Sequence, residues 1–427
     1  MLPIKLFMGR EKSGGIVLIL SVTLAMILAN SNIAESYFHF FEQEVGFIVN
    51  GEPYLNYSLH HWINDGLMAM FFFVVGLELK REFIGGELAN IRNTILPIGA
   101  AIGGMIVPAL IFLSLNIGTP QTMGWGIPMA TDIAFALGVV YLLGDKVPAS
   151  AKLFLTTLAI VDDLGAVLVI AFFYTSELSI ASLLFGLCFL AVMFIGNRLG
   201  IKSLFFYAAL GIGGVWVTFL LSGIHATIAA VLAAFMIPAD AKINESVYLK
   251  RMKKLTRRFE KEEPNEVRTL EEGQVDVLTH IQHDTEIAIP LLQQLEHKMS
   301  PIVTFLIMPI FAIANAGISF TDLSLSDIFS THVALGVTLG LLLGKPIGII
   351  GATFLMVKMR WATLPSAITR RTLIGLGMLA SIGFTMSMFI STLAFTDELL
   401  MTQAKLGIFL ASILGGIGGY MLLNKKS

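Results

Sequence analysis

Long apolar segments divide the sequence, and their length constrains the fold more than any other feature. About twelve segments approach the roughly 20 residues that a helix needs to cross a bilayer. They are residues 14–31, 61–79, 95–115, 124–144, 151–174, 179–197, 203–221, 223–238, 301–320, 333–357, 373–395 and 404–423. The chain of 427 residues is 56% hydrophobic, which excludes an ordinary soluble domain. We therefore predict an all-α polytopic membrane protein with about twelve transmembrane helices.

The basic residues are unevenly distributed between the connecting loops. With the N-terminus in the cytoplasm, all but two of the 28 Lys and Arg residues fall on the cytoplasmic side; Lys345 and Lys405 lie in or at the edge of apolar segments. The positive-inside rule therefore predicts that both termini are cytoplasmic. Residues 14–31 could be a signal peptide, but residues 29–31 do not form a small-x-small cleavage site, so we interpret them as a retained helix.

The connection at residues 32–60 contains a hairpin signal. Two short apolar runs flank Asn50-Gly51, a pair typical of the tight turn between antiparallel strands. We therefore expect a small extracytoplasmic β-hairpin near residues 45–58. An isolated hairpin is only marginally stable. We therefore expect this hairpin either to pack on its own monomer or to contact a second subunit and form a homodimer.

A second long connection, residues 239–299, is rich in charge. Apolar residues recur at helical spacing from Tyr248 to Phe259 among basic residues, which predicts a basic amphipathic helix at the membrane surface. An acidic linker is expected around residues 264–276, and a solvated loop is the alternative for the whole stretch. This cytoplasmic loop separates two predicted transmembrane regions, residues 1–238 with helices 1–8 and residues 300–427 with helices 9–12.

Charged residues near the middle of apolar segments are the strongest functional signal. A charge there costs about 2.5–3.5 kcal/mol, and four residues carry one: Asp132, Asp162, Asp163 and Lys345. Adjacent helical residues point about 100° apart, so one of the paired acids can meet Lys345 while the other lines a cavity. A carboxylate in a partly dry cavity can hold either a proton or a small cation. Such competition is the basis of cation/proton exchange.

Two alternatives apply to these charges. An ion pair that only locks helices together would use Lys345 and one acid, but it leaves the second adjacent acid and Asp132 without partners. Asp132 by itself could cap a broken helix. The net charge of −2 and the single Cys188 indicate neither nucleic-acid binding nor a disulfide framework, and we find no sign of a cofactor or of enzymatic catalysis.

Small residues and proline mark three of the segments. Pro128 in the fourth, and six Gly, Ser and Thr residues in the eleventh, predict interrupted helices whose ends point at a binding site. In the tenth, small residues at intervals of four predict the close approach of a neighbouring helix. These are Gly336, Gly340, Gly344 and Gly348.

Several short motifs also follow one another along residues 10–238 and 300–424. They include Val75-Gly76-Leu77-Glu78, Ala130-Thr131-Asp132, Asp162-Asp163-Leu164-Gly165, Gly223-Ile224-His225, Gly344-Lys345-Pro346 and Gly383-Phe384-Thr385. In these motifs the chain resembles the bacterial NhaA-type sodium/proton antiporters. The resemblance implies a multi-pass protein of the bacterial inner (plasma) membrane with inverted repeats, in which helices 4 and 11 are discontinuous and cross.

The resemblance also implies roles for the site residues. Asp163 is then the principal ligand of the transported Na⁺, and Asp162, the second ligand, pairs with Lys345 until the cation loads. Asp132 and Lys345 would compensate helix dipoles, with Thr131 beside the ion. Exchange of two H⁺ per Na⁺ or Li⁺ would be electrogenic.

The family's pH regulation maps to six positions: Glu78, Arg81, Glu82, His225, Glu296 and His297. Residues 78–82 could instead be a solvated charge run and His225 a satisfied histidine at a helix end. Asp65 resembles a funnel residue, with a structural role as the alternative. The sequence departs from the family pattern at Gln293-Gln294 and Ser300 and in the length of the preceding loop, which puts the pH threshold in doubt.

We therefore predict an antiporter that exports Na⁺ or Li⁺ in exchange for H⁺ across a lipid membrane. A cation-coupled solute symporter of similar architecture is the first alternative, but the acids lack additional polar residues for a solute. A membrane sensor or channel is the second, although a channel favours repeated ligand rings over one asymmetric cluster.

Overall fold

The computed structural model describes residues 11–49, 52–89, 91–175, 178–262, 269–320 and 332–424. Within these ranges, eight helices are long and apolar enough to cross a membrane, or up to ten if each of two bent helix pairs is one span. The seventh and eighth predicted spans form shorter apolar helices, Leu204–Leu220 and Ala226–Met236. A mostly helical, multi-pass membrane protein is thus confirmed, while the number twelve stays a prediction.

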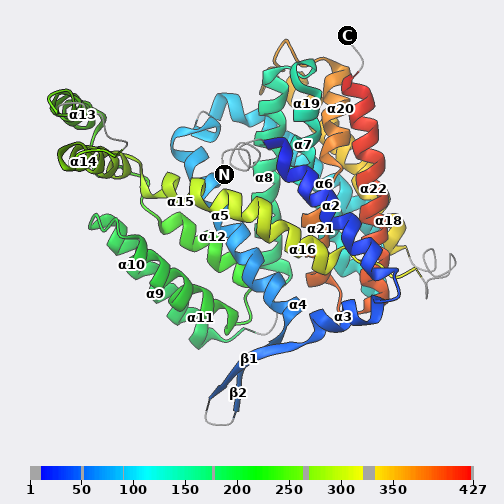
Figure 1. Cartoon of the computed structure of the whole chain (residues 1–427). Helices are drawn as coiled ribbons and strands as arrows, with labels where there is room; N and C mark the ends of the chain where they lie inside the picture. Colours follow the sequence, from blue (N-terminus) through cyan, green and yellow to red (C-terminus); the bar gives the residue numbers. More distant parts are fainter. Residues whose placement is uncertain are drawn as a thin grey trace.

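Figure 1 shows the helices packed side by side with the sheet at one end. The elements up to the charged connection are α2 (Glu11–Ala29), α3 (Ala34–Glu42), β1 (Glu44–Val49), β2 (Glu52–Ser58), α4 (Leu59–His61), η1 (Trp62–Leu67), α5 (Met68–Gly85), η2 (Glu87–Ala89), α6 (Ile91–Asn116), η3 (Pro120–Met129), α7 (Ile133–Leu143), η4 (Gly144–Lys146), α8 (Ala149–Phe173), α9 (Ile180–Arg198), α10 (Leu204–Ala208), η5 (Ala209–Trp216), α11 (Val217–Leu220) and α12 (Ala226–Met236).

The elements that follow are α13 (Glu245–Phe259), α14 (Glu272–Ala288), α15 (Leu291–Ile302), η6 (Val303–Ile307), α16 (Met308–Asn315), α18 (Val333–Leu339), η7 (Gly340–Gly344), α19 (Lys345–Lys358), α20 (Arg370–Ala380), α21 (Phe384–Ala394) and α22 (Glu398–Asn424). The ninth span begins earlier than its apolar run suggests, because α15, η6 and α16 form one continuous helical stretch from Leu291 to Asn315.

A small β-hairpin is present where it was predicted. Strands β1 and β2 pair antiparallel, with Glu44 opposite Ser58 and an irregularity between Val45 and Phe47; the Asn50-Gly51 turn lies outside the described residues. The hairpin stands out from the helical body (Figure 1), and its own chain holds its base, because the Trp62 indole donates to the Val45 carbonyl at 2.8 Å. A homodimer through this hairpin stays a prediction.

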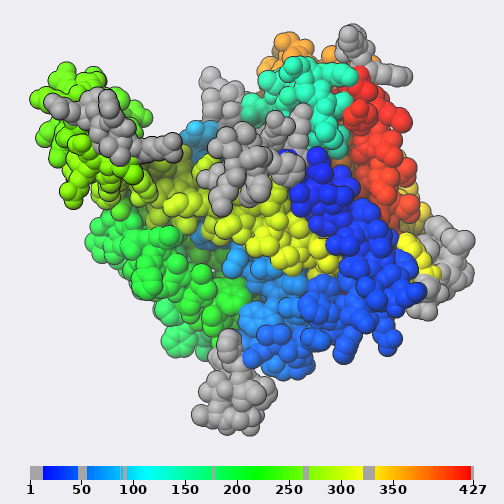
Figure 2. Space-filling view, viewed as in Figure 1, coloured from blue at the N-terminus to red at the C-terminus, as the bar shows by residue number. Residues whose placement is uncertain are grey.

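The charged connection folds into an antiparallel pair of helices, α13 and α14. The basic amphipathic helix predicted around residues 248–259 corresponds to α13, but the acidic linker is shorter than predicted, because α14 begins at Glu272. A capping box explains this start, since Glu271 and Gln274 satisfy each other's backbone N–H groups. The pair projects from the body as a separate lobe (Figures 1 and 2).

Glycines let α19 and η7 approach α6 closely, as the spacing predicts. A Cβ atom added at Gly348 would lie 2.1 Å from the Gly103 carbonyl oxygen, and one at Gly344 would lie 2.9 Å from the Pro108 Cα. Only hydrogen atoms fit at these two contacts. This close packing places Lys345, the first residue of α19, inside the bundle, where its side chain is fully buried.

Candidate ion-binding site

Two helix interruptions meet in the core of the bundle. In the first, η3 ends at Met129 directly after Pro128, the backbone from Ala130 to Asp132 is extended, and α7 begins at Ile133. In the second, α20 ends at Ala380 and α21 begins at Phe384 with a bend of 44°.

Hydrogen bonds join these two interruptions directly. The Asp132 backbone N–H donates to the Ile382 carbonyl at 2.7 Å, and the Thr131 hydroxyl donates to the Ala380 carbonyl at 2.9 Å. Backbone groups that the missing helical turns would have satisfied are therefore satisfied across the gap.

Asp132 is buried and serves two helix N-termini at once. Its Oδ1 accepts from the Phe135 backbone N–H at 3.1 Å, which caps α7. Its Oδ2 accepts from the Thr385 backbone N–H at 3.1 Å and from the Thr385 hydroxyl, which satisfies the first turn of α21. A negative charge is favourable at both positions because helix N-termini carry partial positive charge.

Lys345 provides the opposite charge at the end of η3. Its ammonium forms an ion pair with Asp162, with Nζ and Oδ2 2.5 Å apart, and donates a hydrogen bond to the Met129 carbonyl. Both side chains of the ion pair are fully buried. A cation beside the last carbonyl groups of a helix offsets their partial negative charge.

Asp163 differs from its neighbour because it forms no ion pair within the described residues, and its Oδ1 is unpartnered. This atom is buried and has no hydrogen-bond partner within the described residues, and Asp162 Oδ1 is in the same condition. Unsatisfied buried oxygens are costly unless a proton or a cation occupies them. The adjacent acids therefore present two free carboxylate oxygens beside one ion pair.

Two contacts of this site escape prediction from the sequence. Thr385 is one of the small residues that predict an interruption in the eleventh segment, and that pattern does not predict its bond to Asp132. The Met129 carbonyl carries no sequence signal, because every residue has one. Ser387 of the same segment has a buried hydroxyl without a hydrogen-bond partner in the described part of the chain.

Three of the six residues assigned to pH regulation form one charged cluster. Arg81 contacts Glu82 at 2.8 Å and Glu296 at 2.7 Å, which links α5 to α15. Glu78 lies one turn earlier on α5, and the exposed His297 follows Glu296 on α15.

His225 lies apart from that cluster. It precedes α12, and its Nε2 is 2.7 Å from the carbonyl oxygen of Tyr174, just after α8. The Tyr174 phenol donates to the Met123 carbonyl at 2.6 Å. The six residues therefore do not form a single group.

Asp65, the suggested funnel residue, pairs with His61 at 3.1 Å. Beside it lies a polar network that the sequence did not predict: Asn315 donates to Asn64 at 3.0 Å and lies 3.0 Å from the ring of His60. The network joins the end of α16 to the start of the second span.

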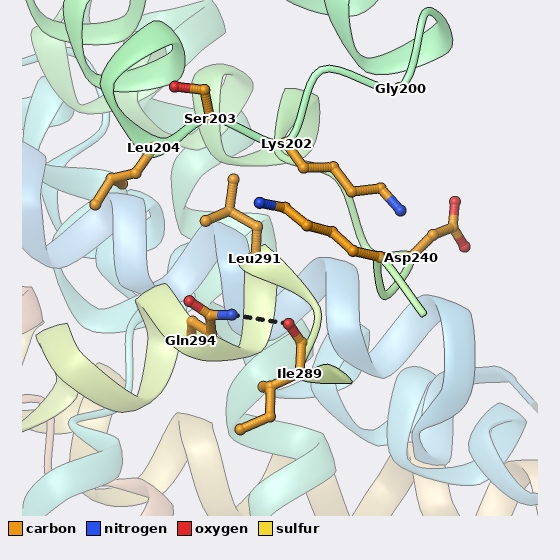
Figure 3. A pocket seen from close by; sticks show the side chains of 9 residues that line it. Gly200, Lys202, Ser203, Leu204, Asp240, Ile289, Leu291 and Gln294 are labelled. Atoms are coloured by element: carbon orange, nitrogen blue, oxygen red, sulfur yellow. Dashed lines mark hydrogen bonds between the residues drawn. The ribbon is translucent and has the colours of Figure 1, made fainter. Parts of the chain in front are cut away.

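Two cavities lie away from the acidic cluster. One of about 600 Å³, shown in Figure 3, lies at the base of the α13–α14 pair, where Lys202, Asp240 and Lys242 line it and Gln294 donates to the Ile289 carbonyl. Another of about 580 Å³ lies between α5, η5 and α12 and is almost entirely apolar. The described His, Cys, Asp and Glu residues form no group of three suited to a bound metal, so a cation at Asp163 would also need hydroxyl or carbonyl oxygens.

Comparison with known proteins places the chain in a family. Residues 5–423 match the model of the family described as Na⁺/H⁺ antiporter 1. The Na⁺/H⁺ antiporter NhaA 2 of Syntrophotalea carbinolica is 49% identical, over 100% of this chain and 97% of its own length. The Na⁺/H⁺ antiporter NhaA of Wolinella succinogenes is 47% identical, over 98% of this chain and 92% of its own. The chain therefore belongs to the Na⁺/H⁺ antiporter 1 family.

Proposed function

We propose that the chain exports Na⁺ or Li⁺ in exchange for H⁺ and that Asp163 is the principal cation ligand. The single observation that carries the site assignment is the pair of free, buried oxygens on Asp162 and Asp163 beside the Lys345 ion pair. Thr131, whose hydroxyl lies at the meeting of the two interruptions, is a further candidate oxygen ligand.

Charge balance accounts for the proposed exchange of two protons for one cation. In the proton-loaded state Asp163 is protonated and Asp162 pairs with the Lys345 ammonium. An entering Na⁺ displaces the Asp163 proton and draws Asp162 away from Lys345. A buried ammonium without its carboxylate is costly, so Lys345 releases a second proton. One net charge then moves in each cycle, and an inside-negative membrane potential drives Na⁺ outward at about 2.3 kcal/mol per 100 mV.

The proposal extends to regulation and assembly. The contacts of Arg81 with Glu82 and Glu296 support a pH-sensitive link between α5 and α15, because protonation of either glutamate would weaken it. We further propose cytoplasmic termini in the bacterial inner membrane, crossing of the two interrupted helices within inverted repeats, and a homodimer through β1 and β2.

The test measures exchange in everted vesicles from a host without its own antiporters. Addition of NaCl or LiCl, but not KCl, should dequench a ΔpH-sensitive dye, and a pH series would locate the threshold. Asp163→Asn should abolish the response and leave expression and melting temperature largely unchanged, since Asp163 Oδ1 makes no contact that the variant loses. Asp145→Asn, at an exposed acid in η4, is the matched control and should keep full activity. Exchange by the Asp163 variant at the native rate would refute the site assignment.

A further inference from the structure

The helix pair α13–α14 carries a one-sided distribution of charge. The sequence of α13 contains six basic residues and one acidic residue. Four of the basic residues fall at intervals of three and four, which places them on one face of the helix. We name this face the basic stripe; it consists of Lys250, Lys253, Lys254 and Arg257.

The opposite face of α13 is already occupied by α14. Tyr248 meets Thr285 through hydroxyl oxygens 3.1 Å apart, and Arg251 forms an ion pair with Asp284 at 3.0 Å. Val277 of α14 is fully buried. The apolar residues of α13 that recur at helical spacing from Tyr248 to Phe259 lie toward this face and are partly buried. A position of this amphipathic helix at the membrane surface stays a prediction.

The basic stripe itself is exposed, and none of its four side chains forms an ion pair or hydrogen bond within the described residues. Most acids of the pair lie on α14, where Asp284 and Asp276 engage Arg251 and Arg258. One side of the lobe is therefore strongly positive, while the negative charge lies on the other helix.

Short connections hold this lobe near the bilayer. Only residues 237–244 separate the end of α12 from α13, and α15 follows α14 after two residues. Two backbone hydrogen bonds fasten the base, from Lys242 N–H to the Ile287 carbonyl at 3.0 Å and from Leu292 N–H to the Pro238 carbonyl at 3.2 Å. Both α12 and α15 enter apolar helical stretches. The lobe thus leaves and returns to the membrane at nearly one point and projects beyond the helical body (Figure 2).

We propose that the basic stripe binds the anionic headgroups of the surrounding bilayer and so holds the α13–α14 lobe against the membrane surface. Charge complementarity and tethering at the interface favour a lipid surface over a soluble partner, because four adjacent basic side chains near an anionic leaflet attract it without apolar insertion. The acidic residues of α14 orient the lobe, since they are repelled from the same surface.

The experiment measures the distance of the lobe from lipid headgroups in the full-length protein. A fluorophore is attached at Thr256→Cys, an exposed position of α13 outside the basic stripe, in a Cys188→Ser background. The protein is reconstituted into vesicles of zwitterionic lipid alone or with about 30% anionic lipid, both containing a fixed amount of nitroxide-headgroup lipid as quencher. Symmetric vesicles make the readout independent of the orientation of the protein and of its transport activity.

Quenching should be roughly twofold greater with anionic lipid at low salt, and should fall to the zwitterionic level at about 0.5 M KCl, where the Debye length is only about 4 Å. Replacing the four stripe residues by Gln should remove the difference between the two lipids. The matched control keeps the charge and should preserve the difference in quenching between the two lipids; it combines Lys250→Arg, Lys253→Arg and Lys254→Arg.

Two outcomes would overturn the proposal. Equal quenching in both lipids would mean that the basic stripe is a solvated face or binds a soluble acidic partner. A difference that survives both high salt and the four Gln substitutions would indicate apolar insertion instead of electrostatic binding. Because none of these readouts depends on ion exchange, a failed transport assay and a failed quenching assay are distinguishable.

Discussion

The first interrupted helix, η3 with α7, brings one charged side chain to its gap, whereas the second, α20 with α21, brings none. Asp132 belongs to the first gap and Lys345 docks against it at the Met129 carbonyl. The second gap contains Ser381, Ile382 and Gly383, and Gly383 makes no side-chain cap. The first α21 turn is satisfied by Asp132 instead.

This asymmetry shows that the second interruption depends on the first. One carboxylate serves the N-termini of both α7 and α21, so the two gaps cannot be arranged independently. Gly383 permits the close approach, because a Cβ atom there would lie 2.3 Å from the Ser387 hydroxyl and 3.1 Å from the Ala130 carbonyl oxygen. The first interruption therefore supplies the carboxylate that both gaps use, while the second interruption supplies backbone groups.

Removal of Lys345 tests the charged gap with the largest expected effect. Lys345→Ala leaves the Asp162 carboxylate buried without its partner, which should cost about 3–5 kcal/mol of unfolding free energy. The melting temperature in detergent should fall, and exchange should be lost. Lys358→Ala, at the exposed end of the same helix, should change stability by less than about 0.5 kcal/mol. An unchanged melting temperature for Lys345→Ala would contradict the ion pair.

Asp132→Ala tests whether one acid supports two helices. Loss of both caps should cost about 2–4 kcal/mol, at roughly 1–2 kcal/mol for each helix N-terminus. Asp397 offers a comparison, since it accepts from the Leu399 and Leu400 N–H groups at the start of α22 alone. Thermal unfolding should show about half the loss for Asp397→Ala; equal losses for the two variants would argue against the shared cap.

Gly383→Ala tests the uncharged gap. Its added methyl group would overlap the Ser387 hydroxyl, and the rearrangement should cost about 1–3 kcal/mol in thermal unfolding. Gly351→Ala is the control, because nothing lies within 4 Å of a Cβ atom at this position of α19. There alanine should be neutral or stabilise the helix by up to about 1 kcal/mol. Equal stability of the two variants would show that the close approach at Gly383 is unimportant.

Thr385→Val has the smallest expected effect. The substitution removes the hydroxyl bond to Asp132 but keeps the bond from the Thr385 backbone N–H, so the cost should be about 0.5–1.5 kcal/mol. Melting temperatures would measure it alongside Asp132→Ala. A loss as large as that of Asp132→Ala would mean that the hydroxyl, and not the backbone cap, holds α21.

Much of this arrangement could be predicted from local sequence. The apolar runs located the helices, Asn50-Gly51 located the hairpin, and the glycines at intervals of four predicted the contact between α19 and α6. The predicted linker within the charged connection is too long, because the capping box at Glu271 starts α14 at Glu272. Local patterns are informative here because hydrophobic period and turn chemistry act over a few residues.

The sequence by itself determined which residues carry charge into the bilayer, because apolar segments tolerate so few that Asp132, Asp162, Asp163 and Lys345 stand out. It left open, on the residues alone, which of the adjacent acids meets Lys345. Only the tertiary structure pairs Lys345 with Asp162, leaves Asp163 Oδ1 unpartnered and gives Asp132 two helices to cap. Those choices depend on the packing of helices far apart in the chain, where rotating one helix by about 100° changes every partner, and no local pattern records that rotation.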